Sequence, residues 1–486
     1  MSEVRGRRGI VAAVAVILVI SAAALVALLA LSGGGSDRAI AMSTMRLVPA
    51  NALVALHLST DRGRNAVRGG ARIAGRLPSW PKIQRDLERR VSASGCGVDL
   101  RRRPGRELTF ALLPVRGGSS TPLLVTDAPA RGVSATPGPC GALVVRKVGS
   151  LVVIGEPAGV AAAAQVAAGG SPALIASPVY RKAAQGLPSD RVLDAWASAR
   201  GTRDLLTPLG GLYATLAGLV DTDGLRGAAA ALTTDSDGAR FVIRRVAVSA
   251  APVAPFRSTL QQQAPADTLT YVASGDLGSG LQRWLLLAAP GAGSPSATTA
   301  RRLEALGRIG RETATLVAPG DKGPTVSLVA RVRRPAAVRA AMTALEPGLA
   351  TLIGAPAGVA WKDSGSGAAR TRTLGDPATA PLAWALDGTT LIISTAPGGI
   401  ATVRGGGPRL AQAPAFQAVT GNLRNPITSL VFLDPKQLLR LGDDTGISPV
   451  GALQGSRTDL ARVRSIGVTT TGTSRLSTVE LSLWIP

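Results

Sequence analysis

The chain is poor in aromatic residues, cysteine and histidine for its length. Aromatic side chains make up 3% of its 486 residues, and there are two Cys and one His. Proteins that bind single-stranded nucleic acid stack bases on aromatic side chains, so this composition argues against that class. A single His excludes a metal site built from several His ligands. Few residues remain from which a metal or catalytic centre could be built.

Lysine is also scarce, although the chain is strongly basic. Only 6 of its 54 Lys and Arg residues are Lys, and the formal net charge is +24. Scattered Arg in an Ala- and Gly-rich chain is typical of a GC-rich genome, and it does not indicate a nucleic-acid partner. The same charge would favour contact with anionic lipid or with acidic wall polymer.

Residues 10–31 predict a transmembrane helix. The run contains no charge, and as a helix its 22 residues would span about 33 Å, close to the thickness of a hydrocarbon core. Arg5, Arg7 and Arg8 precede it, so we expect residues 1–9 to be cytoplasmic and the rest to be exported. Residues 32–44 begin with S-G-G-G-S and are expected to form a flexible linker.

A cleaved signal peptide is the alternative interpretation of this N-terminal segment. Residues 30–32 (A-L-S) would serve as the cleavage site. The apolar run is longer than the 7–15 residues or so of a usual signal-peptide core, which favours a retained anchor. The expected location is therefore the cell membrane, with a single span and an extracytoplasmic C-terminal region.

Sequence motifs recur in the same order along the exported part. Two homologous domains, 45–255 and 262–486, are predicted from this order. The matching pairs are P-A-N-A-L at 49–53 with P-A-D-T-L at 265–269, L-V-V-I at 151–154 with L-I-I-S at 391–394, and Pro172, Leu174, Pro178, Tyr180 and Leu187 with Pro408, Leu410, Pro414, Phe416 and Leu423.

Within each half, short strand-like runs alternate with amphipathic helical stretches, and the half closes on a hairpin pattern. The expected hairpins are 229–234 with 240–248, and 465–470 with 475–483. The extra segment 335–352 predicts a helix that Pro347 and Gly348 would stop. The expected fold class is α+β: an N-terminal transmembrane helix followed by two homologous, mostly antiparallel β-sheet domains with packed helices.

The pattern resembles the bacterial membrane-anchored domain-of-unknown-function family 3352, whose members are uncharacterised envelope proteins. The anchor and the opening P-A-N/D-x-L motif carry the resemblance, together with A-S-G-C-G-V-D-L at 93–100, G-R-E-L-T-F at 105–110, S-P-V-Y at 177–180 and L-P-S-D at 187–190. Membership implies an envelope location and supplies no activity, substrate or catalytic residue.

The two cysteines, Cys96 and Cys140, are expected outside the cytoplasm, where a disulfide between them is permitted. Closing this loop would stabilise the fold by roughly 4 kcal/mol on a chain-entropy estimate. The second half contains no Cys, so the fold does not depend on this bond.

The densest basic cluster in the exported part is formed by Arg101, Arg102, Arg103 and Arg106. Such a cluster could contact an anionic surface such as phosphate-bearing polymer or lipid. The alternative is an ordinary solvated loop.

No recognised catalytic constellation is present. His57 is interpreted as an ordinary strand residue, since the chain has no Gly-x-Ser-x-Gly elbow. Ser79 and Lys82 match the Ser-x-x-Lys signature, but the companion Ser-Asp-Asn and Lys-Thr-Gly motifs are missing, and Ser79 is suited to cap a helix. Neither a cofactor nor a metal site is predicted.

We therefore expect a non-catalytic, membrane-anchored extracytoplasmic protein with a binding or scaffolding role. Its partners would be the membrane, through residues 10–31, and anionic lipid, wall polymer or another envelope protein. The alternative function is an envelope hydrolase or transferase whose active site is not recognisable from the sequence.

Overall fold

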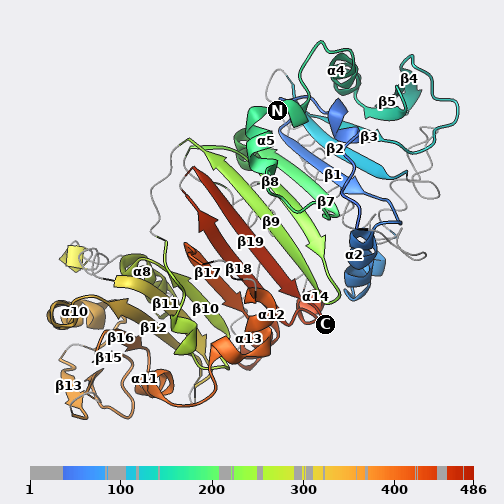
Figure 1. Cartoon of the computed structure of the whole chain (residues 1–486). Coiled ribbons are helices and arrows are strands. Elements are labelled where there is room, and N and C mark those ends of the chain that lie inside the picture. The colour runs from blue at the N-terminus through green and yellow to red at the C-terminus, as the bar shows by residue number, and fades with distance from the viewer. Residues whose placement is uncertain are drawn as a thin grey trace.

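The computed structural model describes residues 37–82, 85, 105–115, 120–140, 143–206, 221, 224–248, 255–288, 298–299, 301–302, 310–320, 323–356, 358–366, 370–421, 423, 425–445, 457–473 and 475–486. In this part of the chain, nineteen strands form one antiparallel sheet with helices on both of its faces (Figure 1).

The strands of the first half pair in the spatial order β4-β5-β6-β3-β2-β1-β7-β8-β9. Their bounds are β1 (Val54–Ser59), β2 (Glu107–Pro114), β3 (Ser120–Thr126), β4 (Gly138–Cys140), β5 (Leu143–Val148), β6 (Leu151–Gly155), β7 (Leu193–Ser198), β8 (Leu225–Thr234) and β9 (Gly238–Ala247).

The second half repeats this order as β14-β15-β16-β12-β11-β10-β17-β18-β19, with β13 added beside β14. The bounds are β10 (Thr270–Ser274), β11 (Gly310–Ala318), β12 (Thr325–Val332), β13 (Trp361–Ser364), β14 (Thr371–Leu374), β15 (Ala383–Asp387), β16 (Thr390–Ser394), β17 (Ser429–Leu433), β18 (Ser465–Gly472) and β19 (Leu476–Trp484).

The two halves are joined by their last strands, which lie side by side in the middle of the sheet (Figure 1). Gly238 pairs with Trp484, and Val246 pairs with Leu476. The register is therefore symmetrical about the central pair, Val242 and Glu480. Two equivalent strands that meet in this way have the geometry of an isologous dimer interface within one chain.

Helices cover both faces of the sheet. On one face, α4, α5, α11 and α12 pack on the main cores of the two halves, while α2, α8 and α10 pack on the other face. The bounds are α2 (Asn65–Gly75), α4 (Pro157–Ala167), α5 (Pro178–Ala184), α6 (Ala199–Gly201), α8 (Leu277–Ala288), α10 (Pro335–Leu352), α11 (Pro397–Arg404), α12 (Pro414–Thr420), α13 (Pro435–Thr445) and α14 (Arg457–Leu460).

Short 3-10 and π-helical segments complete the described structure: η1 (Thr44–Leu47), η2 (Leu174–Ala176), η3 (Thr202–Leu206), η5 (Leu260–Gln262) and η7 (Leu410–Gln412). Segment η1 lies directly before β1, and η5 lies at the equivalent place before β10.

Local sequence accounts for many of these boundaries. Helices α4, α5, α10, α11 and α12 each begin with Pro, whose missing N–H has no partner to lose in the first turn. The β5–β6 and β15–β16 hairpins turn at Gly149 and Gly388, which have φ values of 60° and 55°. That left-handed conformation favours glycine because it has no Cβ.

The expected fold class, a transmembrane helix followed by two β-sheet domains, is wrong. The described strands of both halves form one sheet, because β9 and β19 cover each other's edges. The expected transmembrane helix gains no support, since residues 10–31 lie outside the described residues. In the part of the chain that the structure describes, no helix is both long and apolar enough to cross a membrane.

Two expectations about individual elements also need correction. Pro347 and Gly348 do not stop a helix, because α10 continues to Leu352. The sequence match of L-V-V-I at 151–154 with L-I-I-S at 391–394 is wrong by one residue. In the β5–β6 and β15–β16 hairpins, Leu151 occupies the position that Thr390 occupies, so Val152 is equivalent to Leu391.

Candidate functional site

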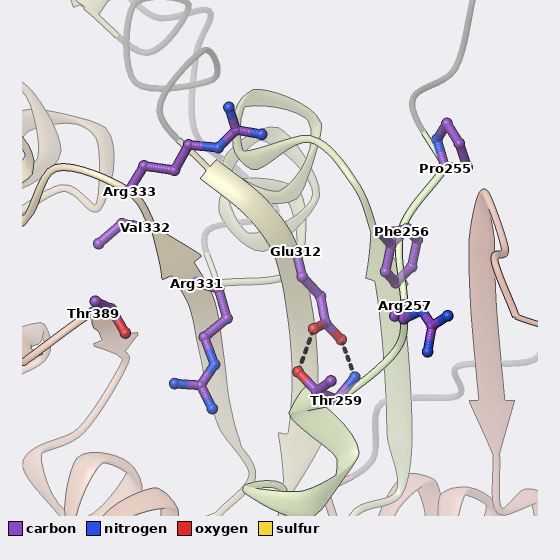
Figure 2. Close-up of a pocket in the computed structure, with 9 residues that line it drawn as sticks. All are labelled: Pro255, Phe256, Arg257, Thr259, Glu312, Arg331, Val332, Arg333 and Thr389. Carbon is purple, nitrogen blue, oxygen red and sulfur yellow. Dashed lines mark hydrogen bonds between the residues drawn. The ribbon is translucent and has the colours of Figure 1, made fainter.

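A cavity of about 710 Å³ in the second half is lined by three arginines (Figure 2). The lining comes from the segment before η5, the first residues of β11, the end of β12 and the β15–β16 turn. We call it the arginine pocket, and its lining residues are Pro255, Phe256, Arg257, Thr259, Glu312, Arg331, Val332, Arg333 and Thr389.

The three arginines come from separate parts of this lining. Arg257 and Arg333 are exposed, whereas Arg331 is half-buried and donates a hydrogen bond to Thr390 Oγ1 at 3.1 Å. Among the described residues, no carboxylate forms an ion pair with any of the three guanidinium groups. Their positive charge is therefore available to a ligand.

Glu312 is the one carboxylate among the described residues that line the pocket, and hydrogen bonds hold it in place. It is 4% exposed, and its oxygens accept from Thr259 N at 2.7 Å, from Leu260 N at 3.0 Å and from Thr259 Oγ1 at 2.6 Å. These donors lie at the start of η5 and stabilise the charged carboxylate. Three guanidinium groups and one carboxylate leave the described lining with a surplus of two positive charges.

The first half has a glutamate equivalent to Glu312 but lacks the arginines. Glu107 accepts from Ser43 Oγ, and also from Thr44 N and Thr44 Oγ1 at 3.2 Å each, as Glu312 does at η5. Arg331 lies opposite Glu312 on the neighbouring strand, whereas Asp127 lies beside Glu107 and accepts from its N–H at 2.9 Å.

The first half has no arginine at the positions equivalent to the three pocket arginines. Arg257 lies two residues before Thr259, and the equivalent position two residues before Ser43 is Ala41. Arg333 lies two residues after Arg331, and Pro129 lies two residues after Asp127. All three arginine positions of the second half thus hold uncharged or acidic residues in the first.

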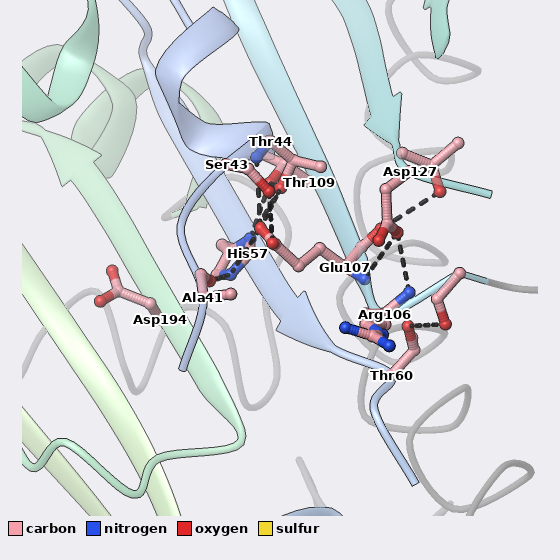
Figure 3. Close-up of polar contacts among 12 residues, drawn as sticks. Ala41, Ser43, Thr44, His57, Thr60, Arg106, Glu107, Thr109, Asp127 and Asp194 are labelled. Carbon is pink, nitrogen blue, oxygen red and sulfur yellow. Dashed lines mark hydrogen bonds and ion pairs between the residues drawn. The ribbon is translucent and has the colours of Figure 1, made fainter. Parts of the chain in front are cut away.

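The first half instead contains a buried polar cluster around the single histidine (Figure 3). Its members, which we call the His57 cluster, are the buried residues Thr44, His57, Glu107 and Thr109 together with the exposed Ser43. His57 Nδ1 lies 2.8 Å from Thr109 Oγ1 and 3.1 Å from Thr44 Oγ1, and Nε2 lies 2.7 Å from the carbonyl oxygen of Ala41. Because a carbonyl only accepts, Nε2 carries the proton and Nδ1 accepts.

Burial keeps this histidine neutral. His57 is fully buried, and desolvation lowers its pKa, although the nearby carboxylates of Glu107 and Asp194 oppose this effect. The Glu107 carboxylate lies 3.8 Å from His57 Nε2. Both ring nitrogens are occupied and no surface is exposed, so His57 cannot serve as a general base for an external substrate.

Asp194 lies opposite His57 on β7 but has partners of its own. It accepts from Tyr180 Oη at 3.1 Å and from Arg191 Nε at 2.7 Å. Burial raises the pKa of Asp194, and the Arg191 charge acts against that shift. Burial, reinforced by the Asp194 charge, also raises the pKa of Tyr180. The aspartate therefore orients no catalytic histidine, since no bond joins it to His57.

The second half fills the equivalent positions with buried apolar side chains. Strand register makes Ala273 equivalent to His57, since each pairs with the corresponding residues of its two neighbouring strands. The pairs are Thr44 with Leu260, His57 with Ala273, Thr109 with Ala314, Tyr180 with Phe416, Arg191 with Ile427, and Asp194 with Leu430. This fold therefore forms without a polar cluster at these sites.

Most of the site residues expected from the sequence fall outside the described part of the chain. Arg101, Arg102, Arg103 and Cys96 lie there, as does the side chain of Cys140, so the basic cluster and the disulfide stay predictions. Arg106 is described, is exposed, and donates its backbone N–H to Asp127 at 2.8 Å. Within the described residues, no group of three or more His, Cys, Asp or Glu could hold a metal ion.

The arginines of the pocket were not singled out from the sequence. They are separated by as many as 76 positions, and only the fold brings Arg257 to Arg333. A residue-by-residue alignment of the two halves would have given a signal, because Asp127 aligns with Arg331.

Comparisons with known proteins add little. No protein-family model matches the chain, and no curated protein matches it. A solved structure of the protein TP0453, in its crystal form I, is similar over 45% of this chain and 75% of its own, with 9% identity and a TM-score of 0.25. The resemblance to the domain-of-unknown-function family stays a prediction.

Proposed function

We propose that this chain is a non-catalytic, membrane-anchored binding protein of the cell envelope, with anionic material as its ligand. The arginine pocket carries the proposal, because it combines three guanidinium groups lacking a carboxylate partner among the described residues with a carboxylate already held by hydrogen bonds. Arginine is the side chain best suited to bind phosphate and carboxylate groups. The envelope location rests on the sequence, namely the uncharged run at 10–31 and the Arg residues before it.

A hydrolase or transferase has less support. His57 is fully buried with both ring nitrogens occupied. Ser79, the serine of the Ser-x-x-Lys match, donates its hydroxyl to Asp459, and its backbone N–H donates to the same carboxylate at 2.9 Å. His57 cannot reach an external substrate, and the Ser79 hydroxyl bonds Asp459 instead of the lysine that the Ser-x-x-Lys signature requires, so no observation among the described residues favours catalysis.

The test is recovery of ligand from cells. The full chain with a C-terminal affinity tag would be crosslinked in intact cells and purified in detergent at physiological salt. The matched variant carries Arg257→Gln, Arg331→Gln and Arg333→Gln. We expect lipid, phosphorus and sugar analysis to find an anionic envelope component with the native chain and at least several-fold less with the variant. Equal recovery from both chains, or no envelope component with either, would contradict the proposal.

A further inference from the structure

The arginine pocket has features that the fold alone does not require. Both halves share the strand order and the Glu that binds the preceding 3-10 segment. The three arginine positions nevertheless hold Ala41, Asp127 and Pro129 in the first half. Because the first half forms the same fold without these arginines, folding does not require them, and a functional role would account for their presence.

The Glu312 carboxylate does not form an ion pair with the arginines of the pocket. Arg331 lies opposite Glu312 on the adjacent strand, yet both carboxylate oxygens accept from the start of η5. A half-buried cation without a counter-ion is unfavourable, and a bound anion would remove this cost.

The positions of the side chains indicate the shape of that anion. Figure 2 shows Arg257 on one side of Glu312 and Thr259, with Arg331 and Arg333 on the other. The three guanidinium groups point in different directions and do not converge on one point, so a ligand that contacts more than one of them must carry its negative charge on separate oxygens spread across the pocket. Thr389 adds a hydroxyl group to the same lining, whereas the Thr259 hydroxyl already donates to Glu312.

We propose that the arginine pocket binds a phosphorylated ligand that carries at least two negative charges. The surplus of two positive charges in the described lining sets the charge of the ligand. A cavity of about 710 Å³ is in the size range of small-molecule sites and leaves room for an organic group attached to the phosphate. The same chemistry occurs in a soluble organic phosphate and in a phosphate lipid headgroup. The inference rests on the proposed binding function and names its ligand class.

The experiment measures pyrophosphate binding to the full chain, purified in detergent, by isothermal titration calorimetry. We expect Arg331→Gln and Arg333→Gln each to weaken binding about 10-fold, because each removes one charge-assisted contact. Arg181→Gln, an exposed arginine on α5 of the first half, removes the same charge at a distance from the pocket and should change affinity less than about 2-fold. Circular dichroism would verify that each variant is folded.

Arg333→Gln is the decisive variant, because its side chain is exposed and the substitution should leave the fold intact. Unchanged affinity in this variant, or an equal loss in Arg181→Gln, would overturn the site. If pyrophosphate fails to bind while cells still yield an anionic component that depends on the arginines, the phosphate class is wrong and the binding function stands.

A competition experiment distinguishes the two sources of phosphate. Glycerol 3-phosphate represents a soluble ligand, and dioctanoyl phosphatidic acid represents a lipid headgroup. Displacement of pyrophosphate by either compound supports the site, and the stronger competitor identifies the source. Displacement by neither would contradict an organic phosphate as the ligand.

Discussion

His57 illustrates how a single buried residue can couple stability to pH. Burial lowers its pKa in the folded state below the ordinary value of about 6.5. At pH values between the lowered pKa and about 6.5, the unfolded chain binds a proton at His57 that the folded chain does not bind. Acidification through this pH range therefore favours unfolding. Asp194 acts in the opposite direction above its ordinary value near 4, because its raised pKa lets the folded state take up a proton first.

We expect the His57 contribution to lower the free energy of unfolding by about 1 kcal/mol between pH 7 and pH 5.5, because the unfolded chain takes up its proton only as the pH falls through about 6.5. Because Asp194 acts in the opposite direction, the His57 contribution is the difference in this loss between the native chain and a variant that lacks His57. Denaturant titrations at the two pH values measure it.

The control for this prediction comes from the second half. Thr44→Leu, His57→Ala and Thr109→Ala together install the residues found at Leu260, Ala273 and Ala314. This triple variant should fold and should lose the acid sensitivity, while Asp194 remains in place. A native chain with equal stability at both pH values, or a triple variant with an undiminished loss, would contradict the account.

At the scale of elements, local patterns predicted hairpins and helices better than the ends of elements. The two closing hairpins occur as β8–β9 and β18–β19, because turn residues and strand runs are local signals. The stop at Pro347 failed because α10 continues its buried face from Leu345 to Leu349. That burial outweighs the hydrogen bond that proline cannot donate.

The pairing of β9 with β19 could not be predicted from local sequence. Each strand has a hairpin partner next to it in the sequence, and its residues do not indicate a second partner more than 200 positions away. The same limit applies to the arginine pocket, whose residues meet only when β11, β12 and the segment before η5 come together. Charge and hydropathy identify the residue types, whereas the long-range register decides which of them meet.

Val479 tests the strand junction, because it lies in β19 between Thr470 of β18 and Ile243 of β9. Val479→Ala should cost about 1.5–2 kcal/mol, through lost packing of a side chain that is 2% exposed. Val479→Pro should cost at least about 1–3 kcal/mol more, because it also removes a backbone donor inside the sheet. Urea unfolding of the three proteins measures the differences.

The junction would be less important than we infer if Val479→Pro were no more destabilising than Val479→Ala. A proline tolerated at this position would mean that β19 behaves as an edge strand.

At the scale of the whole molecule, a nearly symmetrical scaffold carries different chemistry in its two halves. The first half buries the His57 cluster, and Asp127 lies beside Glu107. The second half has an apolar core at the equivalent positions and three arginines around Glu312. This asymmetry is the basis of our proposal that the ligand binds in the second half only.

The most direct measurement of this central claim is a crystal structure of the full chain soaked in tungstate, a tetrahedral oxyanion with a strong anomalous signal. We predict an anomalous peak beside at least one of Arg257, Arg331 and Arg333, and none at the equivalent Ala41, Asp127 and Pro129. The peak in the second half should disappear in the variant that carries Arg257→Gln, Arg331→Gln and Arg333→Gln. Peaks of equal height in both halves, or an arginine pocket without a peak, would contradict the account.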